Sequence, residues 1–397
     1  MGVFVGRSDC ATTTLSNLSS DKGTLIGVAN TGGLVGSSAS TNISNSNSRF
    51  LELTSSGNFA GGLLGSSDTA SVTNISSSYS QGTIKPGGDE GGGIVGRFQG
   101  TGVINDSFSL IDIFNSNGGS NGGLVGRLAD TTSVNRSWSG GDIVITSSSG
   151  VNGGFVGVVR DGAVVSDCFS LGRVEATQFS VGGFAGYCRG TITRSHSSGD
   201  VYSTNTYTGG FVGQSGGVCN ISKSSSSGFV YGNTNVGGFI GLMQSGNHSD
   251  NYSTGTVRGN HFVGGFIGNM EQGAINRSYT TGDTNGIGTS NTVGGFVGQV
   301  DSTSIITNSY NRNDVSGDNI GGFAGNVISG TLTNNYSAAV LSSTTSEYSF
   351  INSITAATLN DNYWDSALSA VDGSSSAASS AGAVSYTHLT LPTKCSV

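Results

Sequence analysis

The sequence predicts an all-β fold: a parallel β-helix, or β-solenoid, of roughly 12 to 13 coils with three short strands in each coil. Three observations support this prediction. A glycine-rich unit recurs at intervals of roughly 27 to 31 residues along almost the whole chain, a period typical of stacked repeats, and a second unit ending in an aromatic residue follows most copies in step. No segment keeps a 3.6-residue periodicity over about ten positions, as a helix requires. Because one such repeat cannot bury its apolar face alone, we expect consecutive repeats to stack.

The first predicted strand of each coil begins at the glycine unit, of which Gly264-Gly265-Phe266-Ile267-Gly268 is a clear copy. Glycine has no Cβ and therefore fits tight corners. Weaker copies lie at 3–6 and 348–351. The leading apolar residues of the eleven strong copies are Leu34, Leu63, Ile94, Leu124, Phe155, Phe184, Phe211, Phe239, Phe266, Phe296 and Phe323. The repeat positions that we take as representative are Gly33, Leu34, Gly36, Gly123, Leu124, Gly126, Gly265, Phe266, Gly268, Gly322, Phe323 and Gly325, with Tyr279 and Tyr336 from the second unit.

The second predicted strand carries the pattern Ile-x-x-Ser-aromatic, as in Ile275-Asn276-Arg277-Ser278-Tyr279. A third, shorter strand follows at Gly141-Asp142-Ile143 and at equivalent positions such as Gly199-Asp200-Val201. Apolar patches of about 3–6 residues are long enough for strands and too short for helices. The aromatic position of the second strand holds Tyr79, Phe108, Trp138, Phe169, His196, Tyr252, Tyr279, Tyr310, Tyr336 and Tyr363.

Residue parity predicts which side chains of the first strand point inward. The leading residue and the apolar residue four positions later, for example Phe266 and Met270, should share the inward face. The residue directly after the leading one is also apolar, as Val35, Leu64 and Val95 show. Two explanations stay open: a corner at the glycine pair encloses this second apolar ladder, or the rod exposes a long apolar stripe. We favour the first, because monomers seldom expose large contiguous apolar patches.

Two ladders of charged residues are predicted on the surface. Their members recur at one position of successive coils, so opposite charges should stack between neighbouring strands and stabilise the pairing by about 0.2–1 kcal/mol per pair. We expect a solvated, charge-matched face rather than a catalytic site. One ladder contains Asp106, Arg136, Asp167, Arg194 and Lys223, and the other contains Asp112, Asp142, Arg173 and Asp200.

Composition narrows the class of protein. Hydrophobic residues make up 34% of the chain, charged residues 10%, and 68 of the 397 residues are Gly, a bias that is also found in disordered segments. The fixed register of apolar positions argues against disorder. A net charge of −8, spread without blocks, disfavours nucleic acid and anionic membranes as partners. No run of eighteen apolar residues is present, so we expect no membrane-spanning segment in this fragment.

The five cysteines predict neither a metal site nor a disulfide framework. Cys10, Cys188 and Cys219 lack the spacing of metal ligands. Cys168 takes a position that holds serine in most other coils, so we expect it to be a small buried residue. His196 belongs to the aromatic ladder and is expected to stack rather than to bind a ligand. No cofactor is expected.

Three segments divide the chain. Residues 1–365 form the repeat domain; because Met1 falls inside a glycine unit, we expect this domain to be truncated at its N-terminus. Residues 366–383 are a Ser/Ala-rich, linker-like segment. Residues 384–397 abandon the composition of the repeats and resemble translated sequencing-adapter DNA, so we treat them as an artefactual tail and exclude them from the prediction of the fold.

The repeated units resemble the GLUG motif. Gly33-Leu34-Val35-Gly36 and Gly123-Leu124-Val125-Gly126, joined to Asn-x-Ser-aromatic segments, carry this resemblance, and Asn362-Tyr363-Trp364-Asp365 closes the array as such arrays tend to close. The resemblance covers roughly residues 1–365. GLUG repeats are found in large bacterial surface and secreted proteins, including adhesin-like passengers. The resemblance therefore implies an extracellular or cell-surface location and a structural or adhesive role, and it carries no catalytic residues.

We accordingly expect a fragment of a bacterial secreted or cell-surface adhesin-like protein that acts as a rigid stalk or binding surface, and not an enzyme. A host-surface protein or glycan is the expected partner. The alternative is a polysaccharide lyase or hydrolase, since parallel β-helices often carry such sites. That chemistry needs carboxylates converging in one groove. The candidates for it are Asp106, Asp167, Asp142, Asp200 and Arg173.

Two other kinds of solenoid are disfavoured. Ice-binding solenoids need a flat array of threonines, and most coils here lack the required pair. Calcium-stacked nonapeptide rolls need Gly-Gly-x-Gly-x-Asp runs, which the sequence does not contain.

Overall fold

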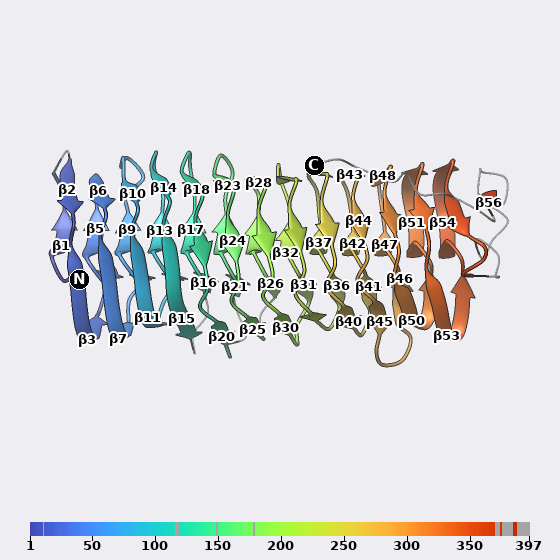
Figure 1. Ribbon diagram of the computed structural model, residues 1–397, viewed down its shortest axis with the longest axis horizontal. Coiled ribbons are helices and arrows are strands. Elements are labelled where there is room, and N and C mark those ends of the chain that lie inside the picture. The colour runs from blue at the N-terminus through green and yellow to red at the C-terminus, as the bar shows by residue number, and fades with distance from the viewer. Residues whose placement is uncertain are drawn as a thin grey trace.

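The fold is described from a computed structural model that covers residues 1–10, 12–115, 119–147, 150–177, 179–369, 374 and 384–386. Within these residues every regular element is a β-strand. Figure 1 shows one elongated solenoid whose coils follow one another from β1 (Val5–Ser8) to β54 (Ile351–Asn360). The predicted fold class is confirmed: neighbouring strands pair in parallel, and the thirteen strands of the first ladder described below make about twelve turns.

Two ladders of strands build a 24-stranded sheet. The first ladder follows the glycine pairs and contains β1, β5 (Val35–Ser38), β9 (Leu64–Ser67), β13 (Val95–Phe98), β17 (Val125–Leu128), β22 (Val156–Val159), β27 (Ala185–Cys188), β32 (Val212–Ser215), β37 (Ile240–Met243), β42 (Ile267–Met270), β47 (Val297–Val300), β51 (Ala324–Thr333) and β54. The second ladder carries the branched apolar residue and contains β2 (Thr13–Ser16), β6 (Thr41–Ser44), β10 (Asn74–Ser76), β14 (Val103–Asn105), β18 (Ser133–Asn135), β23 (Val164–Ser166), β28 (Thr191–Thr193), β33 (Asn220–Ser222), β38 (Asn247–Ser249), β43 (Ala274–Asn276) and β48 (Ile305–Thr307). In the last two coils β51 and β54 are long enough to belong to both ladders.

Three further ladders build a 32-stranded sheet. The third ladder begins at the aromatic residue and contains β3 (Ser19–Gly27), β7 (Asn47–Ser55), β11 (Tyr79–Pro86), β15 (Phe108–Asn115), β19 (Trp138–Ser139), β24 (Phe169–Ser170), β29 (His196–Ser197), β34 (Ser225–Ser226), β39 (Tyr252–Ser253), β44 (Tyr279–Thr280), β49 (Tyr310–Asn311), β52 (Tyr336–Ser337), β55 (Tyr363–Asp365) and β56 (Val384–Tyr386). The fourth ladder continues β3, β7, β11 and β15 and then contains β20 (Ile143–Ile145), β25 (Val174–Ala176), β30 (Val201–Ser203), β35 (Val230–Tyr231), β40 (Val257–Gly259), β45 (Thr284–Gly286), β50 (Asp314–Gly321) and β53 (Val340–Tyr348). The fifth ladder leads into each glycine pair and contains β4 (Thr31–Gly32), β8 (Phe59–Gly61), β12 (Glu90–Gly92), β16 (Gly119–Gly122), β21 (Gly150–Gly153), β26 (Ser180–Gly182), β31 (Tyr207–Gly209), β36 (Asn235–Gly237), β41 (Phe262–Gly264), β46 (Thr292–Gly294) and parts of β50 and β53.

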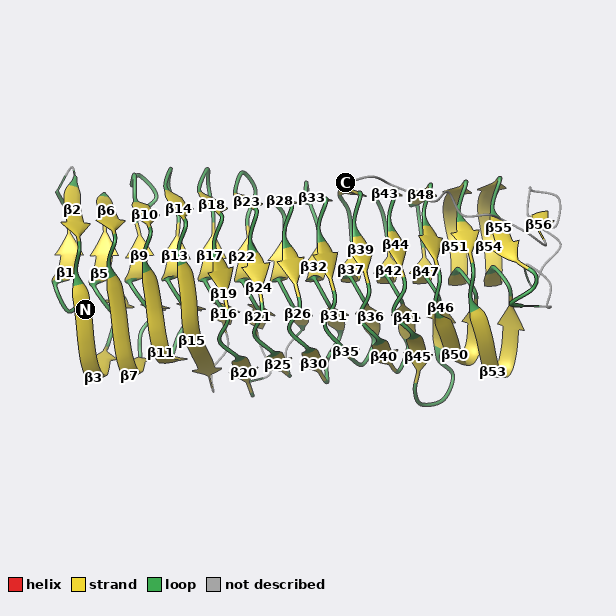
Figure 2. Ribbon diagram, in the orientation of Figure 1, coloured by secondary structure: helices red, strands yellow, loops and turns green. Residues whose placement is uncertain are grey.

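A coil in the middle of the solenoid therefore has five short strands, joined by short loops (Figure 2), where the sequence predicts three. The second predicted strand is split because one residue between the second and third ladders has a left-handed conformation in every coil, with φ between 46° and 60°. Asn and Asp tolerate this conformation better than other non-glycine residues. The residues at this corner are Asn17, Asn45, Ser77, Asp106, Arg136, Asp167, Arg194, Lys223, Asp250, Arg277, Asn308, Asn334 and Asp361.

A serine follows this corner in most coils, and two hydrogen bonds account for its recurrence in the repeated pattern. Ser107 donates its hydroxyl to the carbonyl of Asn105 at 2.8 Å and accepts the N–H of Ser78 in the preceding coil at 3.2 Å. The turn removes the backbone partner of that N–H, and a buried N–H without an acceptor is unfavourable. Ser137 repeats both bonds in the next coil. The serine therefore replaces one backbone hydrogen bond in each of these coils.

The leading residues of the glycine units stack in the interior. The ring centroids of Phe155, Phe184 and Phe211 lie 4.8 and 4.7 Å apart, and the stack continues to Phe350. The N–H groups of Phe155 and Val156 both bond to the carbonyl of Phe184 at 2.9 Å, so the chain turns at the phenylalanine instead of staying extended. Both side chains are completely buried. The explanation in which a corner encloses the second apolar ladder is therefore confirmed.

The glycine pairs let the two halves of the repeated pattern touch inside the coil. A Cβ on Gly154 would lie 2.2 Å from the carbonyl oxygen of Gly183 in the next coil and 2.3 Å from the hydroxyl of Ser170, which follows the aromatic residue. Ser139 occupies the position of Ser170 in the preceding coil, and it donates its hydroxyl to the carbonyl of Gly154 at 2.7 Å. The second glycine of the pair thus has no room for a side chain, because a serine and a neighbouring coil occupy that space.

Candidate functional site

The corner residues form the first predicted charged ladder at the protein surface. Arg136 binds Asp106 through two hydrogen bonds of 2.8 Å, and Arg194 binds Asp167 at 2.7 and 2.8 Å. These hydrogen bonds hold the pKa values of Asp106 and Asp167 below their usual range. All four side chains are at least two-fifths exposed, so each pair contributes little stability. The charge matching between coils is as expected from the sequence.

The second charged ladder satisfies backbone groups. Asp112 accepts the N–H of Asp142 in the next coil at 2.9 Å, and Asp142 in turn accepts the N–H of Arg173 at 2.9 Å. Asp200 accepts the N–H of Phe229 in the same way. The aspartate of the Gly-Asp unit thus ties one coil to the next.

The structure does not bring the candidate carboxylates for polysaccharide chemistry into one groove. Asp106 and Asp112 mark the two ladders in one coil: Asp106 lies at the corner before strand β15, and Asp112 lies within that strand. Asp167 and Asp142 belong to these same two ladders. Arg173 forms an ion pair with Glu175 and lies over the ring of Tyr202, 5.1 Å from its centroid.

The aromatic ladder forms two stacked runs at the surface. Tyr79, Phe108 and Trp138 stack at centroid distances of 4.9 and 4.7 Å, and Tyr252 stacks on Tyr279 at 5.0 Å. The second run continues to Tyr310, which lies 5.0 Å from Tyr279, and the interplanar angles within the two runs are 2° to 7°. Because stacked rings turn their faces toward one another, mainly their edges meet the solvent.

His196 lies between these two runs. Its Nδ1 is 2.8 Å from the hydroxyl of Ser225, and partial burial lowers its pKa. The side chain is held within its ladder, and among the described residues no group of three or more His, Cys, Asp or Glu is placed to hold a metal ion.

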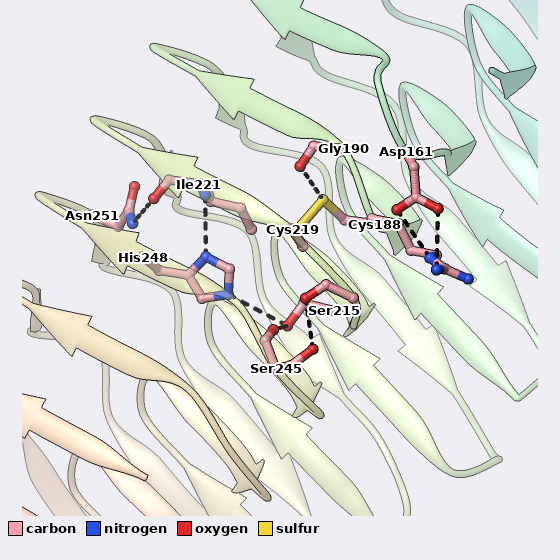
Figure 3. The surroundings of a disulfide bond; sticks show 11 residues. Asp161, Cys188, Gly190, Ser215, Cys219, Ile221, Ser245, His248 and Asn251 are labelled. Carbon is pink, nitrogen blue, oxygen red and sulfur yellow. Dashed lines mark hydrogen bonds and ion pairs between the residues drawn. A yellow bond between two sulfur atoms is a disulfide. The ribbon is translucent and has the colours of Figure 1, made fainter. Parts of the chain in front are cut away.

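A disulfide joins Cys188 to Cys219 (Figure 3), although the sequence did not predict a disulfide framework. The two Cα atoms are 5.6 Å apart and both side chains are completely buried. Ser215 is the register partner of Cys188 in the following coil, and Cys219 lies four positions after Ser215. From there Cys219 bonds to Cys188, the last residue of β27. Spacing rules for metal sites and small disulfide-rich proteins do not detect this arrangement, because it depends on the coil length.

His248 occupies the branched apolar position of the second ladder, between Ile221 and Ile275, and is buried near the disulfide (Figure 3). Its Nδ1 accepts the N–H of Ile221 at 3.1 Å, and its Nε2 lies 3.4 Å from the hydroxyl of Ser215. Burial lowers the pKa of His248 to about 3. The imidazole is therefore neutral and takes the place of an aliphatic side chain. The sequence analysis did not single out this residue.

A groove of about 240 Å³ crosses four coils on the fourth ladder. It is lined by Val144, Ile145, Thr146, Glu175, Ala176, Thr177, Tyr202, Ser203, Thr204 and Tyr231. The coils become shorter along this region, since the interval Phe184–Phe211 contains fewer residues than the interval Leu124–Phe155. Hydroxyl groups and two tyrosines give the groove a mixed polar and aromatic lining.

Four arginines gather on the outer side of the first ladder, and we call them the arginine cluster: Arg97, Arg127, Arg160 and Arg189. Arg97 and Arg127 are register partners in adjacent coils. Arg160 and Arg189 directly follow the first-ladder strands of the next two coils. Their N–H groups bond to the carbonyls of Leu128 and Val159 in the preceding coil, each at 2.8 Å. The sequence analysis did not identify this cluster, because its members fall on two different repeat positions.

Residues 289–316 match the family described as the GLUG motif. This segment includes β46, β47, β48 and β49 and so contains a glycine pair, the branched apolar position and the aromatic position of one coil. Register pairing places the same positions of neighbouring coils over one another. No curated protein and no solved structure matches the chain. The described residues include no long apolar helix of the kind that crosses a bilayer.

Proposed function

We propose that this GLUG-repeat β-solenoid is part of a bacterial secreted or cell-surface adhesin-like protein, in which it acts as a rigid stalk and binding surface. The observation that carries the proposal is the uninterrupted stack of coils, in which each ladder runs through the described repeats. At about 4.8 Å per coil, twelve turns give a rod on the order of 60 Å long. A GLUG motif on such a fold is compatible with an extracellular repeat protein.

The disulfide supports an extracellular or cell-surface location. Disulfides persist in oxidising compartments and are rare in the reducing cytosol. Cys188 and Cys219 are completely buried, so the bond is part of the packed interior rather than an exposed redox centre.

The proposal includes no catalytic activity. The carboxylates considered for polysaccharide cleavage are engaged in ion pairs or with backbone N–H groups along their own ladders. Acid–base cleavage of a glycosidic bond requires two such groups on either side of one bond. Incubation with pectin, alginate and hyaluronan should therefore give no turnover, and turnover that Asp167→Ala abolishes would contradict this part of the proposal.

The binding role is tested with the recombinant chain on host cells, matrix proteins and immobilised glycans. We expect saturable binding to at least one of these surfaces, with a partner that is a host-surface protein or glycan. Heat-unfolded chain is the matched control, since it keeps the composition and loses the ladders. Complete absence of specific binding would leave only a spacer role.

A further inference from the structure

The arginine cluster places four guanidinium groups on one face of four consecutive coils. Arg97 and Arg127 belong to β13 and β17, and Arg160 and Arg189 directly follow β22 and β27. Successive coils are about 4.8 Å apart, so the cluster extends about 14 Å along the solenoid axis. The whole chain has 16 Lys and Arg against 24 Asp and Glu, and a quarter of its basic residues therefore lie in this short region.

Carboxylates neutralise only part of this charge. Glu90 accepts two hydrogen bonds from Arg97, at 2.8 and 2.6 Å, and lies 3.4 Å from Arg127. Asp161 binds Arg189 at 3.1 Å (Figure 3 shows Asp161). Two carboxylates thus serve three arginines, and Arg160 has no carboxylate partner among the described residues.

Arg160 is also the least satisfied member of the cluster. Its Nε is buried and has no hydrogen-bond acceptor. Burial and the like charges of Arg127 and Arg189 lower the pKa of Arg160, and the neighbouring Asp161 offsets part of this effect. The guanidinium group nevertheless keeps its proton, as guanidinium groups do in proteins. A buried charged donor without an acceptor and next to like charges is unfavourable, and an anion bound beside the cluster would offset the repulsion between the like charges.

We propose that the arginine cluster binds carboxylate groups of an acidic polysaccharide that lies along the solenoid axis. The proposal rests on the binding role proposed above and names the ligand class. Guanidinium groups bind carboxylates through two parallel hydrogen bonds, and Arg97 already holds Glu90 in this way on the same face. A chain ligand fits because the arginines are distributed along the axis at the coil spacing.

The test measures binding of the full chain to fluorescent hyaluronan and alginate oligosaccharides, whose charges are carboxylates, at about 50 mM and about 300 mM NaCl. We expect binding that weakens at the higher salt concentration. Arg160→Gln should weaken it about 10-fold or more, because a charge-assisted contact is lost. Arg277→Gln removes a charge from the corner ladder and is the matched control, which should change the affinity less than twofold.

Folding is checked in the same samples. Ligand should raise the unfolding temperature of the wild-type chain and leave that of Arg160→Gln almost unchanged, because only the wild type binds appreciably. If Arg160→Gln does not fold, Arg127→Gln takes its place, with an expected weakening of about threefold or more because Glu90 already engages this side chain at longer range.

Three results would overturn the inference. One is equal affinity of Arg160→Gln and wild type. Another is binding of heparin or single-stranded DNA without binding of hyaluronan or alginate, which would indicate a sulfate or phosphate ligand. The third is absence of acidic-polysaccharide binding while the chain still binds host surfaces, which leaves the proposed function standing. Binding of alginate without any binding to host cells, matrix proteins or host glycans such as hyaluronan would support the inference and refute the adhesin role.

Discussion

Replacing Gly154 by Ala should destabilise the middle coils strongly. The added Cβ would lie 2.2 Å from the carbonyl oxygen of Gly183 and 2.3 Å from the hydroxyl of Ser170, where an ordinary contact needs more than 3 Å. One of these obstacles is backbone of the next coil, which is itself bonded to the coil after it. Overpacking typically costs about 1–3 kcal/mol, and the rigid obstacle places this change at about 3 kcal/mol.

Hydrogen exchange is the suitable assay for Gly154→Ala, because stacked repeats can unfold locally and need not unfold as one unit. About 3 kcal/mol corresponds to a loss of roughly 100-fold in protection for amides of neighbouring coils, such as Phe155 N–H and Phe184 N–H. Gly216→Ala is the matched control, since its Cβ would meet only the far ends of the flexible Tyr187 and Gln244 side chains. Equal protection in the two variants, or a loss below about 0.5 kcal/mol in Gly154→Ala, would refute the steric argument.

Three further predictions concern the buried cysteines and the buried histidine. Reduction of Cys188–Cys219, which closes a separation of 31 residues, should lower the stability of these coils by about 3–4 kcal/mol in urea unfolding with and without dithiothreitol, and an unchanged midpoint would contradict the structure. His248 has a pKa of about 3 when folded and about 6.5 when unfolded, so the unfolded chain gains the proton first and stability should fall by up to about 5 kcal/mol between pH 6.5 and 3. His248→Ile should remove that part of the pH dependence, and an identical pH profile would show that the ring is accessible to protons. Burial raises the pKa of Cys168 to about 12, so a thiol reagent at pH 8 should label exposed Cys10 within minutes and Cys168 only after unfolding; rapid labelling of both would contradict the packing.

The sequence predicts the fold well because the coil is repeated. The leading apolar residues recur at nearly constant intervals, and stacking is the only arrangement that buries all of them. The stack from Phe155 to Phe350 therefore follows from spacing alone. The same argument predicts that Asp106 pairs with Arg136, since side chains at one position of adjacent coils are neighbours.

The strand count is harder to predict because the corner residue is chemically varied. Asp167, Arg194 and Lys223 all adopt the left-handed conformation, although only Asp favours it intrinsically. Each is followed by a small residue, Cys168, Ser195 or Ser224, and the hydroxyls of Ser195 and Ser224 each accept a backbone N–H of the preceding coil. A pattern without glycine at the turn thus conceals the break between two strands.

The candidate sites are harder still, because they depend on deviations from the repeat. Cys219 meets Cys188 across two adjacent coils although it lies four residues beyond Ser215, the register partner of Cys188. The arginine cluster combines two repeat positions that no single ladder contains. Arg160 stands out only when the partners of its neighbours are known.

The direction of the hydrogen bonds determines how the rod would respond to tension. The hydrogen bonds between coils run along the axis. A force that pulls the two chain ends apart would therefore break the hydrogen bonds of one coil at a time, beginning at the ends of the rod. Each coil released would add one repeat, about 30 residues, to the extended chain. The covalent link between Cys188 and Cys219 would withhold its 31 residues, about 100 Å of contour length, from that extension. Peeling that reached this linked pair of coils would therefore bypass the residues between the two cysteines and continue beyond them.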